Sequence, residues 1–198
     1  ASHEAIEAKG SISISAGSVS ATSSDDAINS GSDMTITGGN VSAFSSGNDG
    51  LDANGNMYIK GGYIYAVGSG SPEVALDANS EGGYKLYISG GKLVAFGGIE
   101  SGSSITQPVI NVTSWTANAS YTLCDTDGTE LLKFTAPARG GNGMILSHPD
   151  LVSGNSYTLK SGSSSASVPA TMSSSGSAGG GQGGGGFPGG GGGPGGRH

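Results

Sequence analysis

The sequence lacks residues on which several classes of protein depend. Its one cysteine, Cys124, cannot form an internal disulfide, which excludes a disulfide scaffold. Eight Lys and Arg stand against 15 Asp and Glu, and the formal net charge of −7 argues against a nucleic-acid partner, because binding to phosphates needs clustered cations. No apolar run approaches the roughly 18 residues that a membrane helix needs, so we expect no membrane span.

Charged and aromatic residues are also sparse. Charged residues make up 12% of the chain and aromatic residues 6%, whereas 40 of the 198 residues are glycine. This composition disfavours a helical bundle and fits one domain, or one domain with a small appendage. Ten of the 15 acids lie in residues 4 to 81, so the negative charge belongs to the N-terminal half.

The N-terminal half consists of repeats. Three related copies begin DDAINSGSDMTITGG, NDGLDANGNMYIKGG and EVALDANSEGGYKLYISGG, and a degenerate copy, HEAIEAKGSISISAG, precedes them. Their anchor aliphatics follow one another at spacings of 22, 23 and 25 residues, and they are Ile6, Ile28, Leu51 and Leu76. Such a period predicts a solenoid built from one supersecondary unit after another.

Each copy has the pattern of one solenoid rung. Two short segments of alternating residues, such as Met34-x-Ile36 and Val41-x-Ala43, are separated by a Gly pair. Alternation with β-branched residues predicts strands, and Gly pairs predict tight corners. We therefore predict an all-β fold, a right-handed parallel β-helix of about four rungs over residues 1–97, with the aliphatic columns as its core.

Rungs in register would also stack their polar residues into an acidic ladder. Acids or amides recur three and two residues before the anchors and one residue after them. Neighbouring carboxylates repel, so such a ladder needs a cation, and oxygen ligands favour Ca²⁺ over zinc or copper. The predicted ligands are Asp25, Asp26, Asn29, Asn48, Asp49, Asp52, Glu73 and Asp77, with Asn54, Asn79, Glu4 and Glu7 as further candidates. The alternative is that these side chains only bond backbone N–H groups at turns.

The repeated phrase D-D/N-x-I/L-N/D, a spacer, and ITGG-x-V resembles a bacterial family of extracellular β-helical carbohydrate-binding domains that bind calcium within their coils. The similarity continues through YISGGKLVAFGG, TDGTELLKFTAP and SHPDLVSGNSYTLKSG, so that most of the chain resembles the C-terminal half of such proteins, which are usually longer. The resemblance implies a non-catalytic protein, extracellular or on the cell surface, that binds or adheres to an acidic or plant cell-wall polysaccharide.

Tyrosines on the outside of the predicted rungs are the candidate sugar contacts. Tyr58 and Tyr87 share one column, and Tyr63 and Tyr65 flank the inward Ile64. Flat aromatic rings on a rigid face can stack on sugar rings. A further outward column holds Phe44, Val67 and Phe96. The alternative is that the C-terminal module or a neighbouring subunit covers one of these faces.

The repeat ends near residue 97. Residues 98–108 predict a crossing loop, and residues 109–161 predict a small antiparallel β module that caps the last rung. Asp127-Gly128 predicts a hairpin turn in this module, with Trp115 and Cys124 in the module core. Residues 162–198 are a Ser- and Gly-rich tail, whose composition cannot bury a core.

Two other functions stay open. The Gly-rich tail and a first rung that begins at Ala1 would suit a subunit of a self-assembling extracellular filament, in which the copies form a homopolymer. The second is calcium-dependent cleavage of a pectate-like chain with Lys60 or Lys92 as the base, but no Arg or His lies in a complete rung. Because the chain begins without Met, we expect a processed or truncated product.

Overall fold

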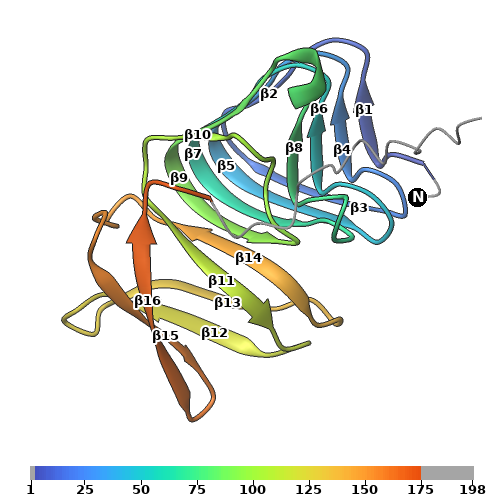
Figure 1. Ribbon diagram of the computed structural model, residues 1–198. Helices are drawn as coiled ribbons and strands as arrows, with labels where there is room; N and C mark the ends of the chain where they lie inside the picture. The colour runs from blue at the N-terminus through green and yellow to red at the C-terminus, as the bar shows by residue number, and fades with distance from the viewer. Residues whose placement is uncertain (1–2, 175–198) are drawn as a thin grey trace, which may run out of the picture.

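The computed structural model describes residues 3–174, which are all-β apart from a three-residue 3-10 turn, η1 (Ser80–Gly82). A stack of parallel rungs adjoins an antiparallel region (Figure 1). The strands of the rungs are β1 (Ile6–Ala8), β2 (Ile12–Ile14), β3 (Ser18–Ser23), β4 (Ile28–Ser30), β5 (Met34–Ser45), β6 (Leu51–Ala53), β7 (Met57–Val67), β8 (Leu76–Ala78) and β9 (Leu86–Phe96). The later strands are β10 (Ser104–Ile105), β11 (Val109–Trp115), β12 (Ser120–Cys124), β13 (Glu130–Thr135), β14 (Gly141–Ser147), β15 (Ser156–Ser161) and β16 (Ser164–Thr171). Within residues 3–174 no helix has the length and hydropathy of a membrane span.

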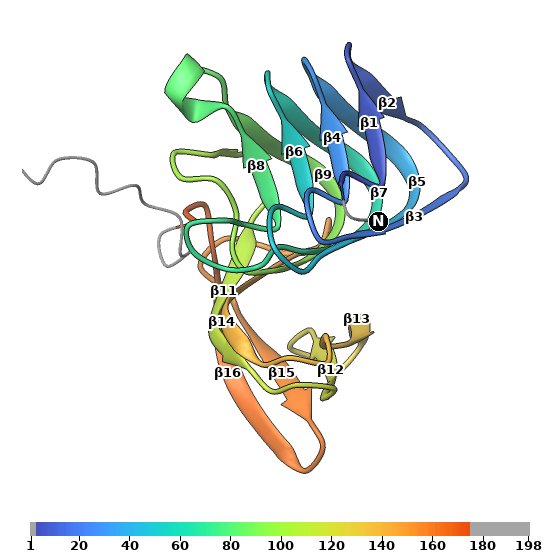
Figure 2. The ribbon, with the colours of Figure 1, turned by 90° about the vertical axis from the view of Figure 1, so that its right-hand side faces the viewer.

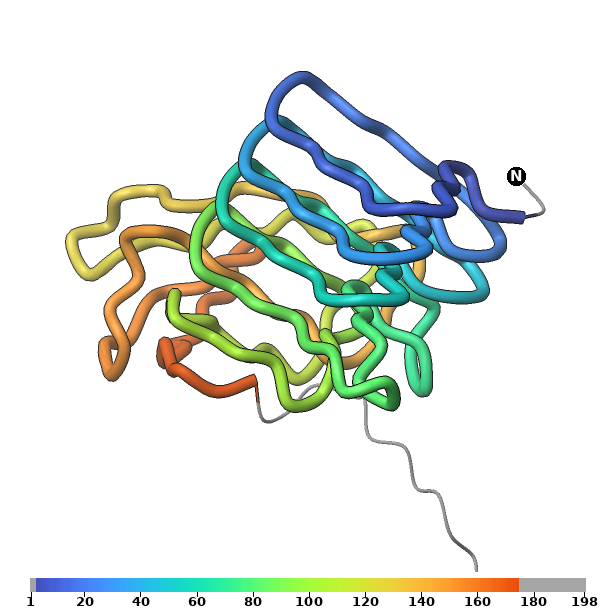
Figure 3. Tube along the Cα trace, turned by 90° about the horizontal axis from the view of Figure 1, so that it is seen from above, coloured from blue at the N-terminus to red at the C-terminus, as the bar shows by residue number. Residues whose placement is uncertain are grey.

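The repeats stack as parallel rungs of a β-solenoid, which confirms the predicted fold class. Strands β1, β4, β6 and β8 form one parallel sheet, with their anchors in register (Figure 2). On the other side of the coil, β5, β7 and β9 pair in parallel, so that each turn lies beside the previous one (Figure 3). The inward aliphatic columns form one core, in which Ile28, Leu51 and Leu76 are fully buried.

The Gly pairs form a corner where successive rungs touch backbone to backbone. Gly62 has φ +85°, and a Cβ there would lie 2.8 Å from the carbonyl oxygen of Gly39. We expect Gly62→Ala to lower the free energy of unfolding by roughly 2–6 kcal/mol, measured by urea denaturation and about 1–3 kcal/mol more than strain alone, because strain and a clash add together.

Gly83→Ala is the matched control for this substitution. Gly83 also has φ +85°, but nothing lies within 4 Å of its added Cβ. The control should therefore lose only the roughly 1–3 kcal/mol of backbone strain. Equal losses in the two variants would contradict a role for close stacking at the corner.

Residues 98–108 continue the stack for part of a further rung, which corrects the prediction of a crossing loop. Ile99 forms a parallel bridge with Leu76, and β10 pairs in parallel with β9 through Ser104 and Ile105. Ile99 follows Leu76 by 23 residues, within the period of the earlier anchors. The prediction was wrong because this copy is incomplete: Pro108, and no Gly pair, follows its strand.

The antiparallel region caps the last rung, as predicted, and also covers one outer face of the solenoid. Strand β14 pairs antiparallel with β9, and β11 pairs with β14, so the sheet of the last rung continues into the module. A second layer, β13-β12-β15-β16, packs over this sheet. Between the layers lies a second core, with Val67, Val94 and Phe96 from the solenoid and with the predicted Trp115. Cys124 is buried, as predicted.

The module extends past its predicted boundary at residue 161. Strand β16 pairs with β15 along its length and with β11 at Ile110 and Val109. Composition alone placed residues 162–171 in the tail, but Val168 and Ala170 alternate into the second core. The rest of the predicted tail, residues 175–198, lies outside the described residues, so the filament hypothesis that depends on it stays a prediction.

Candidate functional site

The predicted acidic columns lie along one side of the solenoid, rung over rung. The residues after the anchors are register partners in the order Glu7, Asn29, Asp52, Asp77. The other column is tied together by backbone bonds, because the Asp49 N–H donates to Asp26 Oδ1 at 3.0 Å and the Val74 N–H donates to Asp49 Oδ1 at 2.6 Å. The vertical registration on which the ladder prediction depends is therefore present.

Amide groups already stabilise the lower part of the ladder, around rungs one and two. Asn29 Nδ2 donates to Asp26 Oδ2 at 3.0 Å and to Asp52 Oδ2 at 2.6 Å, and so joins the two columns. Asn48 Nδ2 donates to Asp25 Oδ1 at 2.9 Å. Here the predicted Asn residues act as donors to the carboxylates, which leaves less need for a cation.

The upper part of the ladder gathers acids with fewer donors. Burial raises the pKa of Asp49 to about 8 and that of Asp52 to about 7, and the charge of Glu73 contributes to both shifts. Burial also raises the pKa of Asp77 to about 9, together with a hydrogen bond to Glu100. Among residues 3–174 the close contact found between a carboxylate and a basic side chain is that of Asp150 with His148, which is not part of the ladder.

Glu100 is a ladder residue that the sequence analysis missed. It follows Ile99 as Asp77 follows Leu76, so it extends the column after the anchors into the partial rung. Its charge and its hydrogen bond both raise the pKa of Asp77. The pattern that could have found it is the pair Ile99-Glu100, 23 residues after Leu76-Asp77.

The oxygen donors of the ladder are of the kind that a hard divalent cation takes. The upper ladder contains the carboxylates of Asp49, Asp52, Glu73, Asp77 and Glu100, and burial, with mutual repulsion as a smaller cause, raises the pKa values of the three aspartates. A bound cation would remove that repulsion. Within residues 3–174 the acidic group whose ligand atoms lie close enough together to hold one metal ion is at the lower end, where one ligand atom each from His3, Glu4 and Asp25 lie within 4.8 Å of one another.

A second polar column lies at another corner of the solenoid. Its side chains bond backbone N–H groups, which is the role that the alternative interpretation gave to the ladder. Asp33 Oδ1 accepts from the Asn56 N–H at 2.8 Å, and Asn56 Oδ1 accepts from the Lys85 N–H at 3.1 Å. The sequence analysis missed this column, although each member directly precedes a strand anchor. It contains a single acid, so it needs no cation, and it provides a control for the ladder.

Tyr58 and Tyr87 stack on each other on the outer face of β7 and β9. Their ring centroids lie 5.0 Å apart at an interplanar angle of 11°. Lys60 Nζ lies 4.8 Å from the centroid of the Tyr58 ring. Tyr58 therefore contacts two protein groups, whereas Tyr87 has one ring contact, with Tyr58, among the described residues.

A groove follows the glycine corner and the strand segments after it. One part, of about 790 Å³, runs along the corner from Gly17 to Gly91 and reaches Lys92 and Pro149. The adjoining part, of about 450 Å³, is lined by Tyr63 and Tyr65 and by small side chains. Those side chains are Ser18, Val19, Ser20, Asn40, Val41 and Ser42. Tyr63, Ser18 and Asn40 line both parts, so the groove is continuous.

The module decides which outward residues remain available beside this groove. Val67 and Phe96 are fully buried beneath it, so for these two residues the alternative of a covered face is correct. Tyr65 is partly covered: its ring centroid lies 5.4 Å from that of Phe96, and its hydroxyl donates to the Thr135 carbonyl at 2.8 Å. These contacts fix the orientation of the Tyr65 ring at the groove.

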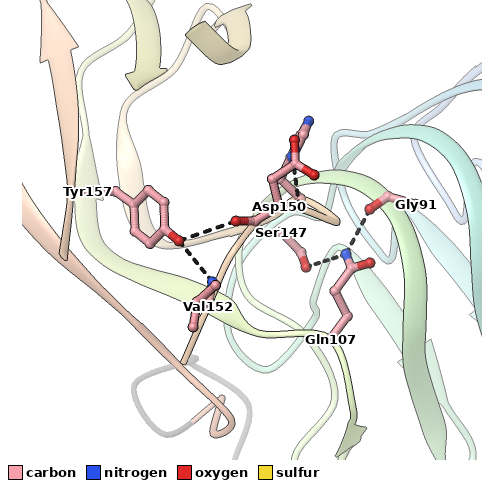
Figure 4. A network of polar contacts seen from close by, with 7 residues as sticks. Gly91, Gln107, Ser147, Asp150, Val152 and Tyr157 are labelled. Atoms are coloured by element: carbon pink, nitrogen blue, oxygen red, sulfur yellow. Dashed lines mark hydrogen bonds and ion pairs between the residues drawn. The ribbon is translucent and has the colours of Figure 1, made fainter. Parts of the chain in front are cut away.

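A hydrogen-bond network holds the module against the far end of the groove (Figure 4). Gln107 Nε2 donates to the Gly91 carbonyl and to Ser147 Oγ, both at 2.7 Å. On the following loop, the Asp150 N–H donates to His148 Nδ1 at 3.2 Å, and burial lowers the pKa of His148, as does the charge of Lys92. The network fixes the loop that carries Pro149 beside Lys92.

Comparison with known proteins points to carbohydrate binding. Residues 1–50 match the model of a family described as carbohydrate-binding domain-containing protein. This match agrees with the carbohydrate-binding part of the resemblance found in the repeats, and it spans the first two rungs, with Asp25, Asp26 and Asp49 of the ladder and Asn40 of the groove. No curated protein and no solved structure matches the chain.

The two lysines considered as catalytic bases lie in the sheet of β7 and β9. Lys60 contacts the Tyr58 ring and Lys92 lines the groove. The ladder residues Asp52 and Asp77 belong to the other sheet, in β6 and β8. The carbohydrate-binding family is consistent with a non-catalytic role, and the absence of catalysis stays a prediction.

Proposed function

We propose that this chain is a non-catalytic, extracellular polysaccharide-binding or adhesive protein that holds a glycan chain in the groove beside Tyr63 and Tyr65. The observation that carries the proposal is the meeting of two tyrosines with a lining of small side chains that includes three serines and an asparagine. A ring face packs on the C–H groups of a sugar, and Ser and Asn bond its hydroxyls. The match of residues 1–50 to a carbohydrate-binding family supports the same function.

The charge of the groove supports an acidic glycan. Lys92 lies at its module end, and no Asp or Glu is among the described residues that line either part. This contrasts with a chain that carries 15 acids. A sugar carboxylate would meet a cation in the groove, whereas elsewhere on the solenoid it would meet the ladder.

Calcium in the upper ladder is the second part of the proposal. The ion would neutralise Asp49, Asp52 and Asp77 and so stabilise the coil that also carries the groove. Calcium sites of extracellular modules bind with dissociation constants of about 10⁻⁴ to 10⁻³ M, which suits a site of this kind outside the cell. A calcium site of this affinity in the ladder would therefore agree with the proposed extracellular location.

Tyr63→Ala tests the groove. We expect the substitution to weaken binding to polygalacturonate by roughly fivefold, since one aromatic contact contributes on the order of 1 kcal/mol. The measurement is retardation in native gels that contain the polysaccharide, over a range of concentrations. Retardation equal to that of the original protein would contradict the groove as the binding site.

Tyr84→Ala is the control for the same experiment. Tyr84 is 42% exposed and lies outside the groove, so its loss should leave retardation unchanged. The same samples, incubated with polygalacturonate and followed by ultraviolet absorbance, should form no unsaturated product. A rise in absorbance would contradict the non-catalytic role.

A further inference from the structure

Tyr87 ends the pair of stacked tyrosines on a face that the groove does not include. The outward column of this sheet runs through the register partners Ser13, Thr35, Tyr58, Tyr87 and Ser104. Tyr58 covers one face of the Tyr87 ring. On the opposite side the register partner is Ser104, whose side chain is too small to stack on the ring as Tyr58 does. Tyr87 therefore has one open face, with a serine hydroxyl beside it.

The stack holds this ring in place. Tyr58 is itself held by contacts with Tyr87 and with the ammonium group of Lys60, which lies 4.8 Å from its centroid. A ring that is held before the ligand arrives loses less conformational entropy on binding. Tyr58 thus acts as support, and Tyr87 is the residue placed to touch a ligand.

This face and the groove belong to different parts of the same strands. Tyr58 and Tyr87 precede the Gly pairs of β7 and β9, whereas Tyr63 and Tyr65 follow the pair in β7. Neither Tyr58 nor Tyr87 lines the groove, and neither packs in the core beneath the module. A ligand on Tyr87 therefore does not have to compete with one on Tyr63.

The charges around the stack match those at the end of the groove. Lys60 in β7 and Lys85, directly before β9, each stand two residues from a tyrosine of the stack, and both are exposed. The acid that faces Tyr58 is Asp33, which contributes to the raised pKa of that tyrosine. Two lysines against one aspartate favour an anionic ligand, although the whole chain is acidic.

We propose that the open face of Tyr87, beside Ser104, is a second and independent sugar site that binds another chain of the same acidic polysaccharide. The inference rests on the proposed function of the groove and extends it: one copy of the protein has two sites on different faces and bridges two glycan chains. Cross-linking of this kind explains adhesion without requiring the protein to assemble with itself.

Agglutination of beads coated with polygalacturonate tests the bridge, with the protein at a concentration where sedimentation gives the mass of a monomer. The original protein should bind the beads and agglutinate them. Tyr87→Ala should still bind through the groove but lose agglutination by tenfold or more in the protein concentration required. Ser104→Phe should do the same, because the new ring would fill the open face of Tyr87 and leave the tyrosine stack intact. Tyr84→Ala should agglutinate normally.

The outcomes separate the two proposals. If both the Tyr87 and the Ser104 variant agglutinate beads like the original protein, or if the original protein binds beads without agglutinating them, the second site is wrong and the groove is unaffected. If Tyr63→Ala binds as well as the original protein while Tyr87→Ala does not bind, the groove is wrong. If the original protein does not bind at all, both proposals fail.

Discussion

Phe96→Ala should lower the free energy of unfolding by about 3–5 kcal/mol, the usual cost of removing a buried aromatic ring. Phe96 is fully buried at the junction between solenoid and module. Its ring centroid lies 5.1 Å from that of Trp115 and 5.9 Å from that of Phe134, so the substitution opens a cavity between the two layers of the module. Urea denaturation, followed by tryptophan fluorescence, measures the change.

We expect Phe96→Ala to destabilise the module more than the solenoid. Phe96 faces outward from the solenoid, and its neighbour Ala95 faces the solenoid core. Hydrogen exchange should therefore accelerate in β12 and β15 before it accelerates in β4 and β6. Phe44→Ala is the control, since Phe44 occupies the same outward column two rungs away but is only partly buried, and it should cost less. Equal losses in the two variants would contradict the position of Phe96 as the central contact of the module.

Removal of calcium should lower the melting temperature, and the drop should grow as the pH rises from 5 to 9. Burial raises the folded-state pKa values of Asp52, Asp49 and Asp77 to about 7, 8 and 9 from the ordinary value of 3.8. Without metal, the folded protein retains protons that the unfolded chain has released, so stability falls as the pH rises from about 4 through these values. At the upper end of this range the carboxylates are charged and calcium binds in full. An ion at a thousandfold excess over its dissociation constant adds about 4 kcal/mol.

The effect of Asp52→Asn on the melting temperature should change sign when calcium is added. In a chelator at pH 8 the variant should melt higher than the original protein, because it removes one member of a group of repelling acids. In excess calcium it should melt lower, because a ligand is lost. Asp33→Asn is the matched control, since Asp33 accepts a backbone N–H in the column that has a single acid. If both variants respond alike to calcium in differential scanning calorimetry, the ladder is not a calcium site.

The sequence alone predicted the solenoid because a repeat specifies the fold one unit at a time. Ile6, Ile28 and Leu51 recur at nearly constant spacing, and parallel in-register pairing then follows for every residue near them. The acidic ladder was predictable for the same reason: if the anchors stack, their neighbours stack. The repeat pattern did not reveal Ile99 and Glu100 as parts of a rung, because this last copy is incomplete and no Gly pair follows its strand.

Only the tertiary structure decided what becomes of the outer faces. Period-two alternation shows that Phe96 and Tyr87 both face outward, and nothing in either strand says that the module buries one of them and leaves the other available. That choice depends on contacts between residues far apart in the sequence, such as Phe96 with Trp115 and Tyr65 with Thr135. Which aspartates are buried enough for their pKa values to rise was likewise decided by packing. A short repeat sets the contacts between one rung and the next, whereas burial of an outer face depends on a partner segment that the repeat does not contain.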